Sequence, residues 1–480
     1  MAELVDVLKR LEQRHKAQLP DLERLNSFYE GKQSLSYLHP ELIAELDDRL
    51  KQVVINWPEL VVDSLDDRLD VEGFRVWGDS KLEDQLWEQW QRNDLDEASQ
   101  MGHQEAMVCE RAYTIVGTNE DADEDETPLI TVESPFEVVH ENDPRTRTVR
   151  DAAKFWCEGE GKDKVDHATL YVPGITAWWI RDGDDWIEDP EYKRDEHNLD
   201  FNPVTPLLNK TRLHGDGIYG RSELASIIPI SDAACKIGTD MMVSAEFHAM
   251  PRRWALGFGP EDFVDEVGNK ISAWSKVAGR IWASMKRKDE GAEVGQFPEA
   301  DLKNFHDTLN LLARMCGALG ALPPHYMGFS DGNPASADAI RSSESRLVKR
   351  AERRQRGYGG TWETTQRKAL AITGRDVSDL ARMETVWRDP ATPTKAQAAD
   401  AAVKLFTAGI STKRQARIDV GYTDTQIKRM EEEDAEELER DPVTQLGQAM
   451  RMSPAQQAAL DAAEADDEAV LAGAAAAQGQ

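Results

Sequence analysis

Three glycines in the stretch HGDGIYGRSEL have the spacing G-x-G-x-x-G, the fingerprint of a loop that binds a dinucleotide. They are Gly215, Gly217 and Gly220. In a dinucleotide-binding fold this loop follows a buried strand and opens the helix of a βαβ unit. Here the preceding stretch NPVTPLLNKTRL has two prolines and ends in polar residues, and no βαβ repeat follows. We therefore favour a turn that needs glycine for a positive φ or for close backbone approach.

Other motifs of catalysis and metal binding are missing from the sequence. It has no G-x-x-x-x-G-K-[ST], H-E-x-x-H or G-x-S-x-G motif, and its histidines are scattered. The four cysteines form no C-x-x-C pair, which indicates reduced thiols rather than a zinc site or a disulfide framework. We expect no cofactor and favour a structural protein over an enzyme. A nucleotide-binding enzyme that uses the loop from Gly215 to Gly220 is the alternative.

The acidic stretch NEDADEDETP, residues 119–128, begins like a calcium-binding loop. However, Glu126 stands where the sharp turn of such a loop requires glycine, and no Glu follows at the twelfth position. The flanking stretches YTIVGT and LITVES are typical of strands. The sequence therefore predicts a β-hairpin with a solvated acidic loop and no metal.

Composition limits the classes of function. The chain has 480 residues and a net charge of −32, and 40% of its residues are hydrophobic. Such an acidic chain is a poor general binder of nucleic acid, but its surface would let a polyanion pass without sticking. The opening MAELVDVLKR lacks the apolar core of a signal peptide, and no run of 18 apolar residues occurs. We expect a soluble protein without a membrane partner.

Hydrophobic spacing in the first half predicts helices and then a β-rich region. The helices are expected over residues 3–30, with a break at Pro20, and over 41–52, 57–69 and 81–112. A short strand is expected in VEGFRVWG, and residues 151–188 continue as β structure. We expect the tryptophans of this region to pack on one sheet face: Trp156, Trp178, Trp179 and Trp186.

The second half predicts two helices that bracket a small β insertion. The helices cover residues 222–249 and 298–319, and short strands lie between them. A Gly- and Pro-rich loop follows at 320–336, and then a long helix to about residue 372. That helix carries a basic run, which fits a contact with DNA or an acidic neighbour as well as a solvated helix face. The run is Arg341, Arg346, Lys349, Arg350, Arg353, Arg354 and Arg356.

The order of these parts is similar to that of the portal proteins of tailed bacteriophages, especially the group from phages with long non-contractile tails. Four phrases carry the resemblance: FYEGKQSL (28–35), NWPELVVDSLDDRLDVEGFRV (56–76), NKTRLHGDGIYGRSEL (209–224) and ALPPHYMGFSDGNPASADAIRSSESRLVKRAERRQ (321–355). Their order is more specific than any one of them, and the likeness spans about residues 25–440.

The resemblance implies an α+β fold and a portal-type elongated subunit. The implied parts are a wing (1–221), a stem helix (222–249), a clip (250–297), a second stem helix (298–319), a tunnel loop (320–336), a long wing helix (337–375) and a helical crown with a low-complexity acidic and alanine-rich tail (376–480). The family forms a ring, usually of twelve subunits, at one capsid vertex. Another virion structural protein, such as an adaptor or capsid-associated protein, is the alternative.

The resemblance also implies partners and a place. In this family the ring is a channel for double-stranded DNA during packaging and ejection, and the protein itself hydrolyses nothing. It docks the large subunit of terminase and later the head–tail adaptor, and it assembles with scaffold and major capsid proteins. We therefore expect a virion protein that is assembled in the host cytoplasm.

Site residues follow from this comparison together with the side-chain types. The bulky side chains of the tunnel loop that would line the DNA channel are His325, Tyr326, Met327 and Phe329. Weak basic contacts to DNA would be Arg252, Arg253, Lys286, Arg287 and Lys288, with ordinary surface charge as the other interpretation. The seam that packs the stem, spaced by three and four, is Leu302, Phe305, Leu309 and Leu312. The glycines Gly215, Gly217 and Gly220 would form the turn from wing to stem.

Overall fold

The computed structural model describes residues 2–34, 53–119, 127–159, 161, 164–197, 199–249, 253–256, 291, 293–296, 302–328, 336–393 and 395–440. They belong to two compact units, Met1–Ala391 and Thr392–Gln480. The expected α+β class is confirmed, because helices and antiparallel sheets both contribute to the first unit. The helix expected over 41–52 and the acidic loop at 120–126 lie outside the described residues.

The first helix, α1 (Ala2–Tyr29), runs through Pro20 without the expected break. A proline inside a helix removes one backbone hydrogen bond, which costs roughly 3 kcal/mol. Burial of leucines on both sides of the proline opposes a break. Leu8 and Leu11 are fully buried against one sheet, and Leu22 and Leu25 are buried in the main core. Tertiary packing therefore keeps the two halves in one helix.

Among the described residues, three further helices and a short strand follow α1 before residue 109. They are α3 (Trp57–Asp66), strand β1 (Val71–Arg75), α4 (Ser80–Arg92) and α5 (Leu95–Val108). The single helix expected over 81–112 is wrong, because the chain turns at Asn93 and Asp94. Asp94 has a left-handed backbone with φ of 50°, and the Asn93 amide donates to the Gln89 and Pro128 carbonyls. Two short helices thus replace one long one.

A five-stranded antiparallel sheet has the order β4-β5-β6-β7-β8. Its strands are β4 (Val138–Asn142), β5 (Val149–Glu158), β6 (Val165–Val172), β7 (Ile175–Asp182) and β8 (Asp185–Glu188). Trp179 and Trp186 are buried with Leu8 and Leu11 of α1. The strand register puts Trp156 and Trp178 on the opposite face, so the expected single tryptophan face is wrong.

A three-stranded sheet has the order β3-β2-β9, with β2 (Arg111–Gly117), β3 (Leu129–Glu133) and β9 (Val204–Leu208). The pairing of β2 with β3 confirms the expected hairpin. One face packs Tyr113 and Ile115 against the five-stranded sheet. The other face packs against α5 and the long helix α9 (Ala337–Ile372). The β2 strand is therefore buried on both faces.

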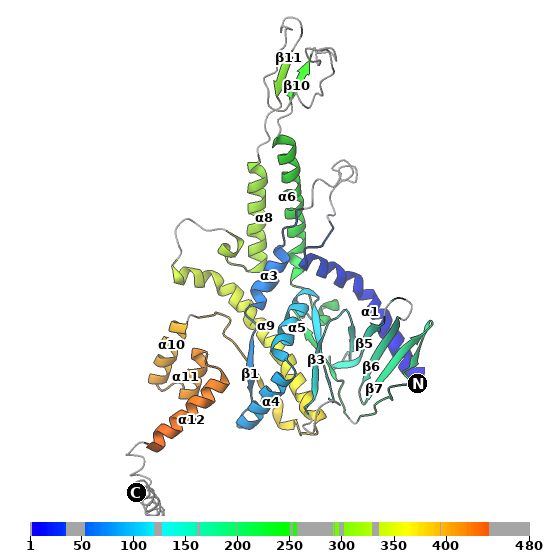
Figure 1. The fold of residues 1–480 in the computed structure, drawn as a ribbon, viewed down its shortest axis with the longest axis vertical. Coiled ribbons are helices and arrows are strands. Elements are labelled where there is room, and N and C mark those ends of the chain that lie inside the picture. The colour runs from blue at the N-terminus through cyan, green and yellow to red at the C-terminus, as the bar shows by residue number, and fades with distance from the viewer. Residues whose placement is uncertain are drawn as a thin grey trace, which may run out of the picture. The chain divides into compact units, whose positions relative to one another are not determined.

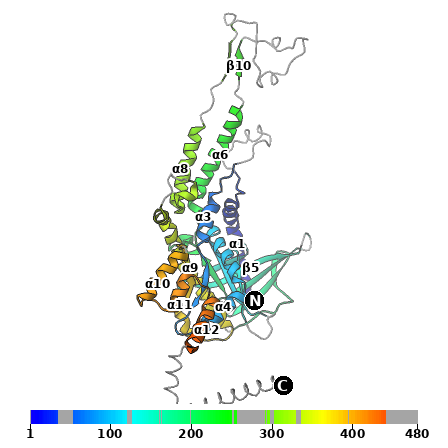
Figure 2. The same cartoon turned by 60° about the vertical axis from the view of Figure 1, so that its left-hand side comes forward.

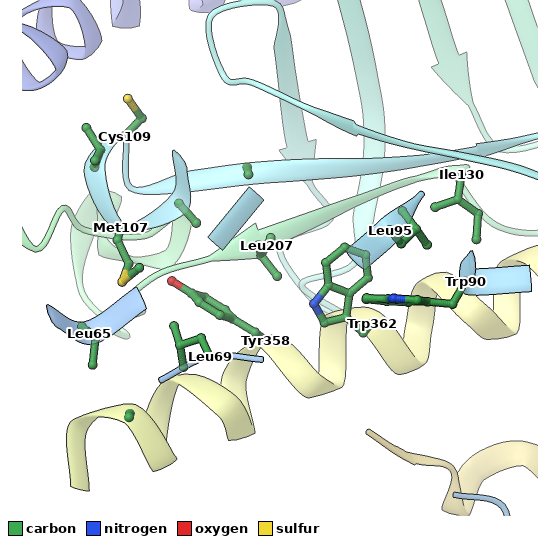
Figure 3. Close-up of a cluster of buried hydrophobic side chains, with 14 of the residues drawn as sticks. Leu65, Leu69, Trp90, Leu95, Met107, Cys109, Ile130, Leu207, Tyr358 and Trp362 are labelled. Atoms are coloured by element: carbon green, nitrogen blue, oxygen red, sulfur yellow. The ribbon is translucent and has the colours of Figure 1, made fainter. Parts of the chain in front are cut away.

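The main hydrophobic core lies where α9 crosses this sheet (Figure 3). The rings of Trp90 and Trp362 meet edge to face, with centroids 4.9 Å apart. The Trp362 indole N–H donates to His103 Nε2 at 2.9 Å. Burial lowers the pKa of His103 to about 3, so this histidine is neutral at physiological pH. The aromatic cluster therefore fixes α9 to α4 and α5 without a buried charge.

Strand β12 (Glu384–Trp387) returns the chain to β1 after α9 and pairs with it antiparallel. Arg68 also donates to the carbonyl of Pro390. Contacts between residues about three hundred positions apart in sequence thus hold an early and a late part of the first unit together.

Two helices, α6 (Ile228–Ala249) and α8 (Lys303–Gly320), lie side by side and antiparallel (Figures 1 and 2). Between them in sequence, β10 (Arg253–Leu256) pairs with β11 (Glu293–Gln296). Leu302, which precedes α8, and Phe305, Leu309 and Leu312 of α8 are half-buried, whereas the residues between them are exposed. Leu312 and Cys316 pack with Ile230 of α6.

The second unit contains three helices among the residues that the structure describes. They are α10 (Lys395–Thr407), α11 (Lys413–Val420) and α12 (Asp424–Arg440). Asp434 of α12 accepts from Lys413 at 2.7 Å and from Arg417 at 2.5 Å, which holds α11 to α12. No described helix of either unit is long and apolar enough to span a bilayer.

Asp66, at the end of α3, gives a testable effect of charge on stability. Its burial, followed by the charges of Asp63, Asp67 and Asp70, raises its pKa to about 7. A carboxyl with a raised folded-state pKa weakens folding as the pH rises from about 4 to 7, because the unfolded state ionises first. Asp66→Asn should therefore stabilise the protein by on the order of 2 kcal/mol at pH 8.

Thermal unfolding of Asp66→Asn at pH 4 and at pH 8 measures this effect. The exposed Asp182, which is not among the charges that act on Asp66, supplies the matched control, and Asp182→Asn should change the melting temperature little at either pH. An Asp66→Asn gain that is equal at the two pH values would contradict the assignment.

Candidate functional site

The glycine-rich stretch joins the β-rich part of the chain to α6. The sequence led us to expect no buried strand before it, but the buried strand β9 does precede it. The stretch itself forms the 3-10 turns η2 (Gly215–Tyr219) and η3 (Leu224–Ser226), and β9 pairs antiparallel with β2, unlike the parallel strands of a βαβ unit. Gly215 and Gly220 have positive φ values of 59° and 106°. A Cβ on Gly220 would lie 2.1 Å from the Glu110 carbonyl oxygen and 3.2 Å from that of Asn209. Gly220 is therefore a site of close backbone approach, with no room for a side chain.

Asn209 holds both sides of this turn. Its backbone N–H donates to the Glu110 carbonyl at 2.9 Å, and its carbonyl accepts from the Arg221 N–H at 2.8 Å. Its side-chain amide donates to the Arg221 carbonyl at 2.8 Å, and its Oδ1 accepts from the Tyr358 hydroxyl at 3.2 Å. The turn is thus connected to β2 and to α9 by hydrogen bonds of one buried residue.

Glu223 follows the turn, and its carboxylate is completely buried. Arg354 donates to Glu223 Oε1 through Nε at 3.0 Å and through Nη2 at 2.6 Å. Arg350 and Lys210 contact Oε2. Burial on its own raises the pKa of Glu223, but Arg350, Arg354 and Lys210 outweigh it and hold the pKa at about 2. The carboxylate therefore stays ionised inside the protein.

The same face of α9 covers the C-terminal end of α8. Arg346 donates to the Ala318 carbonyl at 3.2 Å, and Arg350 donates to the Gly320 carbonyl. The last carbonyls of a helix lack partners within it and carry the negative end of its dipole, so cations stabilise them. Arg350 consequently touches both Glu223 and α8. We call Glu223, Lys210, Arg346, Arg350 and Arg354 the charged junction.

The loop after α8 is fixed on a second group of residues. It forms the turn η6 (Pro324–Met327), in which Tyr326 and Met327 are half-buried against the cluster that contains Val61 and Cys316. Arg68 donates to the Tyr326 hydroxyl at 3.2 Å and to Glu344 of α9 at 3.3 Å. His325 is more exposed, and its Nε2 lies 3.6 Å from Glu344 Oε1.

The other residues singled out in the sequence are only partly covered by the structure. Phe329, Arg252, Lys286, Arg287 and Lys288 lie outside the described residues. Arg253 is the first residue of β10, and only its backbone is described. Their contacts with DNA stay a prediction.

The basic run of α9 divides into two sets. Arg346, Arg350 and Arg354 are spaced by four and belong to the charged junction, so the acidic neighbour of Arg350 and Arg354 is Glu223 of the same chain. The rest of the run is exposed, and Lys349 pairs with Glu352 of its own helix. The spacing of four places three arginines on one helix face. The spacing of these arginines could have indicated the charged junction from the sequence, whereas no sequence pattern marks Glu223.

These groups connect helices to one another. Within the described ranges, no three His, Cys, Asp or Glu residues gather in a way that could hold a metal ion. The charged junction and the Arg68 group instead connect the α6–α8 pair, the glycine turn and η6 to one helix, α9. This geometry fixes the C-terminal end of α8 and the glycine turn to α9.

A family model described as "Phage portal protein, SPP1 Gp6-like" matches residues 8–440. The chain therefore belongs to the phage portal protein family, and the resemblance drawn from the sequence is confirmed.

Two curated relatives carry the same name. The portal protein of Mycobacterium phage D29 is 36% identical over 420 residues, which cover 86% of this chain and 84% of the relative. That of Mycobacterium phage L5 is 36% identical over 426 residues, covering 87% and 85%. A solved structure titled "Neck of native GTA particle computed with C12 symmetry" is similar with a TM-score of 0.41 and 11% identity, over 76% of this chain and 88% of that one. That likeness is too distant to support an argument.

Proposed function

We propose that this portal protein forms a ring, usually of twelve copies, at one vertex of a phage capsid, and that double-stranded DNA enters and leaves through the ring. The membership of residues 8–440 in the portal family carries this proposal. The net charge of −32 supports it, because an acidic channel wall does not retain a polyanion.

The parts of the subunit receive roles in this proposal. The α6–α8 pair is the stem, and residues 250–297 are the clip. Residues 1–221 together with 337–375 are the wing, and residues 376–480 are the crown. The loop 320–336 faces the DNA, with the exposed His325 beside the half-buried Tyr326 and Met327. The charged junction then transmits force from the stem to the wing, because Arg350 contacts both α8 and the glycine turn's Glu223.

The proposed partners bind two different parts of the subunit, the clip and the wing. The clip docks the large subunit of terminase during packaging and a head–tail adaptor afterwards. Scaffold and major capsid proteins surround the wing during assembly in the host cytoplasm. In this role the portal guides DNA and leaves nucleotide hydrolysis to terminase.

Negative-stain electron microscopy with native mass measurement tests the ring. Rings with a central hole and a mass near twelve times 53.8 kDa are the expected result. A monomer or dimer that binds a dinucleotide, with binding lost in Gly217→Val, would overturn the proposal and favour an enzyme built on the glycine loop.

A further inference from the structure

A pocket of about 870 Å³ lies beside α9, nearer the C-terminal end of that helix than the charged junction. One wall is the segment between β4 and β5, with Asp143, Arg147 and Arg150. A second wall is the approach to β9, with Asp200 and Phe201. The third wall is α9 itself.

The α9 wall of this pocket has little side-chain cover. A Cβ on Gly357 or on Gly360 would have no heavy atom within 4 Å, so the helix backbone is open there. Thr361 and Thr364 continue the same wall and are half-buried. Such a surface admits close approach of another polypeptide backbone.

Lys368 is the residue of this wall that lacks a counter-charge. Its Nζ donates to the Val204 carbonyl at 2.9 Å and to Thr205 Oγ1 at 2.8 Å, which leaves one N–H of the ammonium group. Among the described residues, no carboxylate lies within 4 Å of this nitrogen. Burial lowers the pKa of Lys368 to about 7. A carboxylate that entered the pocket would complete its hydrogen bonds and restore its charge.

The charge of the pocket has the opposite sign to that of the chain. Four cations line it, Arg147, Arg150, Arg367 and Lys368, against the carboxylates of Asp143 and Asp200. Asp143 accepts hydrogen bonds from the backbone N–H groups of Arg145 and Thr146, so its carboxylate stabilises the turn in which it lies. Arg150 pairs with Glu141 and Asp151, and Arg367 lies 3.8 Å from Glu363. Among the described residues, Lys368 and the exposed Arg147 are thus the lining cations without a carboxylate partner, and Lys368 is the more buried of the two.

We propose that the Lys368 pocket receives an acidic segment of a second copy of this chain, with a carboxylate accepting a hydrogen bond from Lys368 Nζ. This inference rests on the proposed ring, in which the adjacent polypeptide is another copy. Each copy has 89 acidic against 57 basic residues, so a carboxylate is its most abundant charged group. The apolar lining, which includes Val149, Phe201 and Ala371, excludes water and strengthens such a pair.

A polypeptide fits this pocket better than DNA does. Binding of duplex DNA needs several exposed cations that follow the phosphate backbone. Here two carboxylates lie in the lining, and Arg150 already has partners. The bare α9 backbone at Gly357 and Gly360 also suits a narrow peptide segment instead of a duplex.

Zero-length carbodiimide cross-linking tests the contact, since it joins an amine to a carboxylate that touches it. Rings are assembled from equal amounts of unlabelled and nitrogen-15-labelled full-length chains, cross-linked at pH 7 and analysed by mass spectrometry. The expected product joins Lys368 to an Asp or Glu of a differently labelled copy. Rings that yield no such product, or a Lys368 product within one copy alone, overturn the inference and leave the proposed function standing. Absence of rings overturns both.

Two variants and a competitor sharpen this test. Lys368→Met should lower the NaCl concentration at which the ring dissociates by roughly twofold, because the paired cation is lost. Lys368→Arg keeps the cation and should stay near the parent, and Lys349→Met on the exposed side of α9 is the matched control. Equal salt resistance of Lys368→Met and Lys349→Met contradicts the inference. So does loss of the Lys368 product when a short DNA duplex is added, which would identify a polyanion site.

Discussion

Glu223→Gln should lower the free energy of unfolding by about 3–5 kcal/mol at neutral pH, because removal of one partner leaves buried charges without compensation. The amide cannot neutralise Arg350, Arg354 and Lys210, which all contact the carboxylate. The same change removes the hold of Arg350 on the glycine turn while its contact with the Gly320 carbonyl remains. We therefore expect the helix pair α6–α8 to lose its fixed position before the rest of the first unit unfolds.

The pH dependence of this variant is specific. Glu223 has a folded-state pKa of about 2 against an ordinary value of 4.5. Such a group stabilises the folded state fully above about pH 4.5, and this contribution disappears as the pH falls towards 2. The difference between the parent and Glu223→Gln in urea unfolding should consequently shrink between pH 5 and pH 2.

Glu352→Gln is the matched control for Glu223→Gln, because Glu352 forms an exposed pair with Lys349 on the same helix. Exposed pairs contribute roughly 0–1 kcal/mol, so this control should unfold almost like the parent. If the two glutamate variants had equal stability, the charged junction would have no role in holding the helices.

Gly220→Ala should destabilise the chain by about 3 kcal/mol or more. Its φ of 106° disfavours any side chain, and the added Cβ would collide with the Glu110 carbonyl oxygen at 2.1 Å. Backbone must move to relieve that contact, which disturbs the hydrogen bonds of Asn209 to both strands of the turn.

Gly215→Ala separates the effect of φ from that of space. Gly215 also has a positive φ, but a Cβ there meets no atom within 4 Å. Its replacement should cost about 1 kcal/mol. Urea unfolding and ring yield measure both variants, and equal losses at the two positions would show that close backbone approach at Gly220 is unimportant.

Much of the fold followed from local patterns in the sequence. The hairpin β2–β3, the strands β5 to β8, and the helices α6 and α8 lie where periodicity and turn residues predicted them, whereas β4 was not predicted. The sequence predictions were wrong where contacts between residues distant in sequence outweigh the local preference for a helix break or for a sheet face. The continuation of α1 through Pro20 depends on burial of Leu8 and Leu22 in two separate cores. The division of the tryptophans between two faces depends on strand register, which single positions do not reveal.

The candidate site was predicted less completely. The arginines of α9 were noticed as a charged run, but their partner Glu223 is about 130 positions away and has no motif. The same is true of Lys368, whose importance comes from the absence of a carboxylate among its described neighbours. Contacts of this kind are set by tertiary packing, so sequence spacing alone could not assign them.

The pairing of β1 with β12 has a consequence for the newly made chain. Phe74 and the free edge of β1 emerge from the ribosome early, whereas their partner strand ends at Trp387 and the Arg68 contact is at Pro390. The first unit therefore cannot close until most of the polypeptide has been translated, and until then an unpaired edge beside apolar side chains is open to wrong association. The first unit of a nascent subunit thus completes its two-stranded sheet only once the last fifth of the chain has begun to emerge.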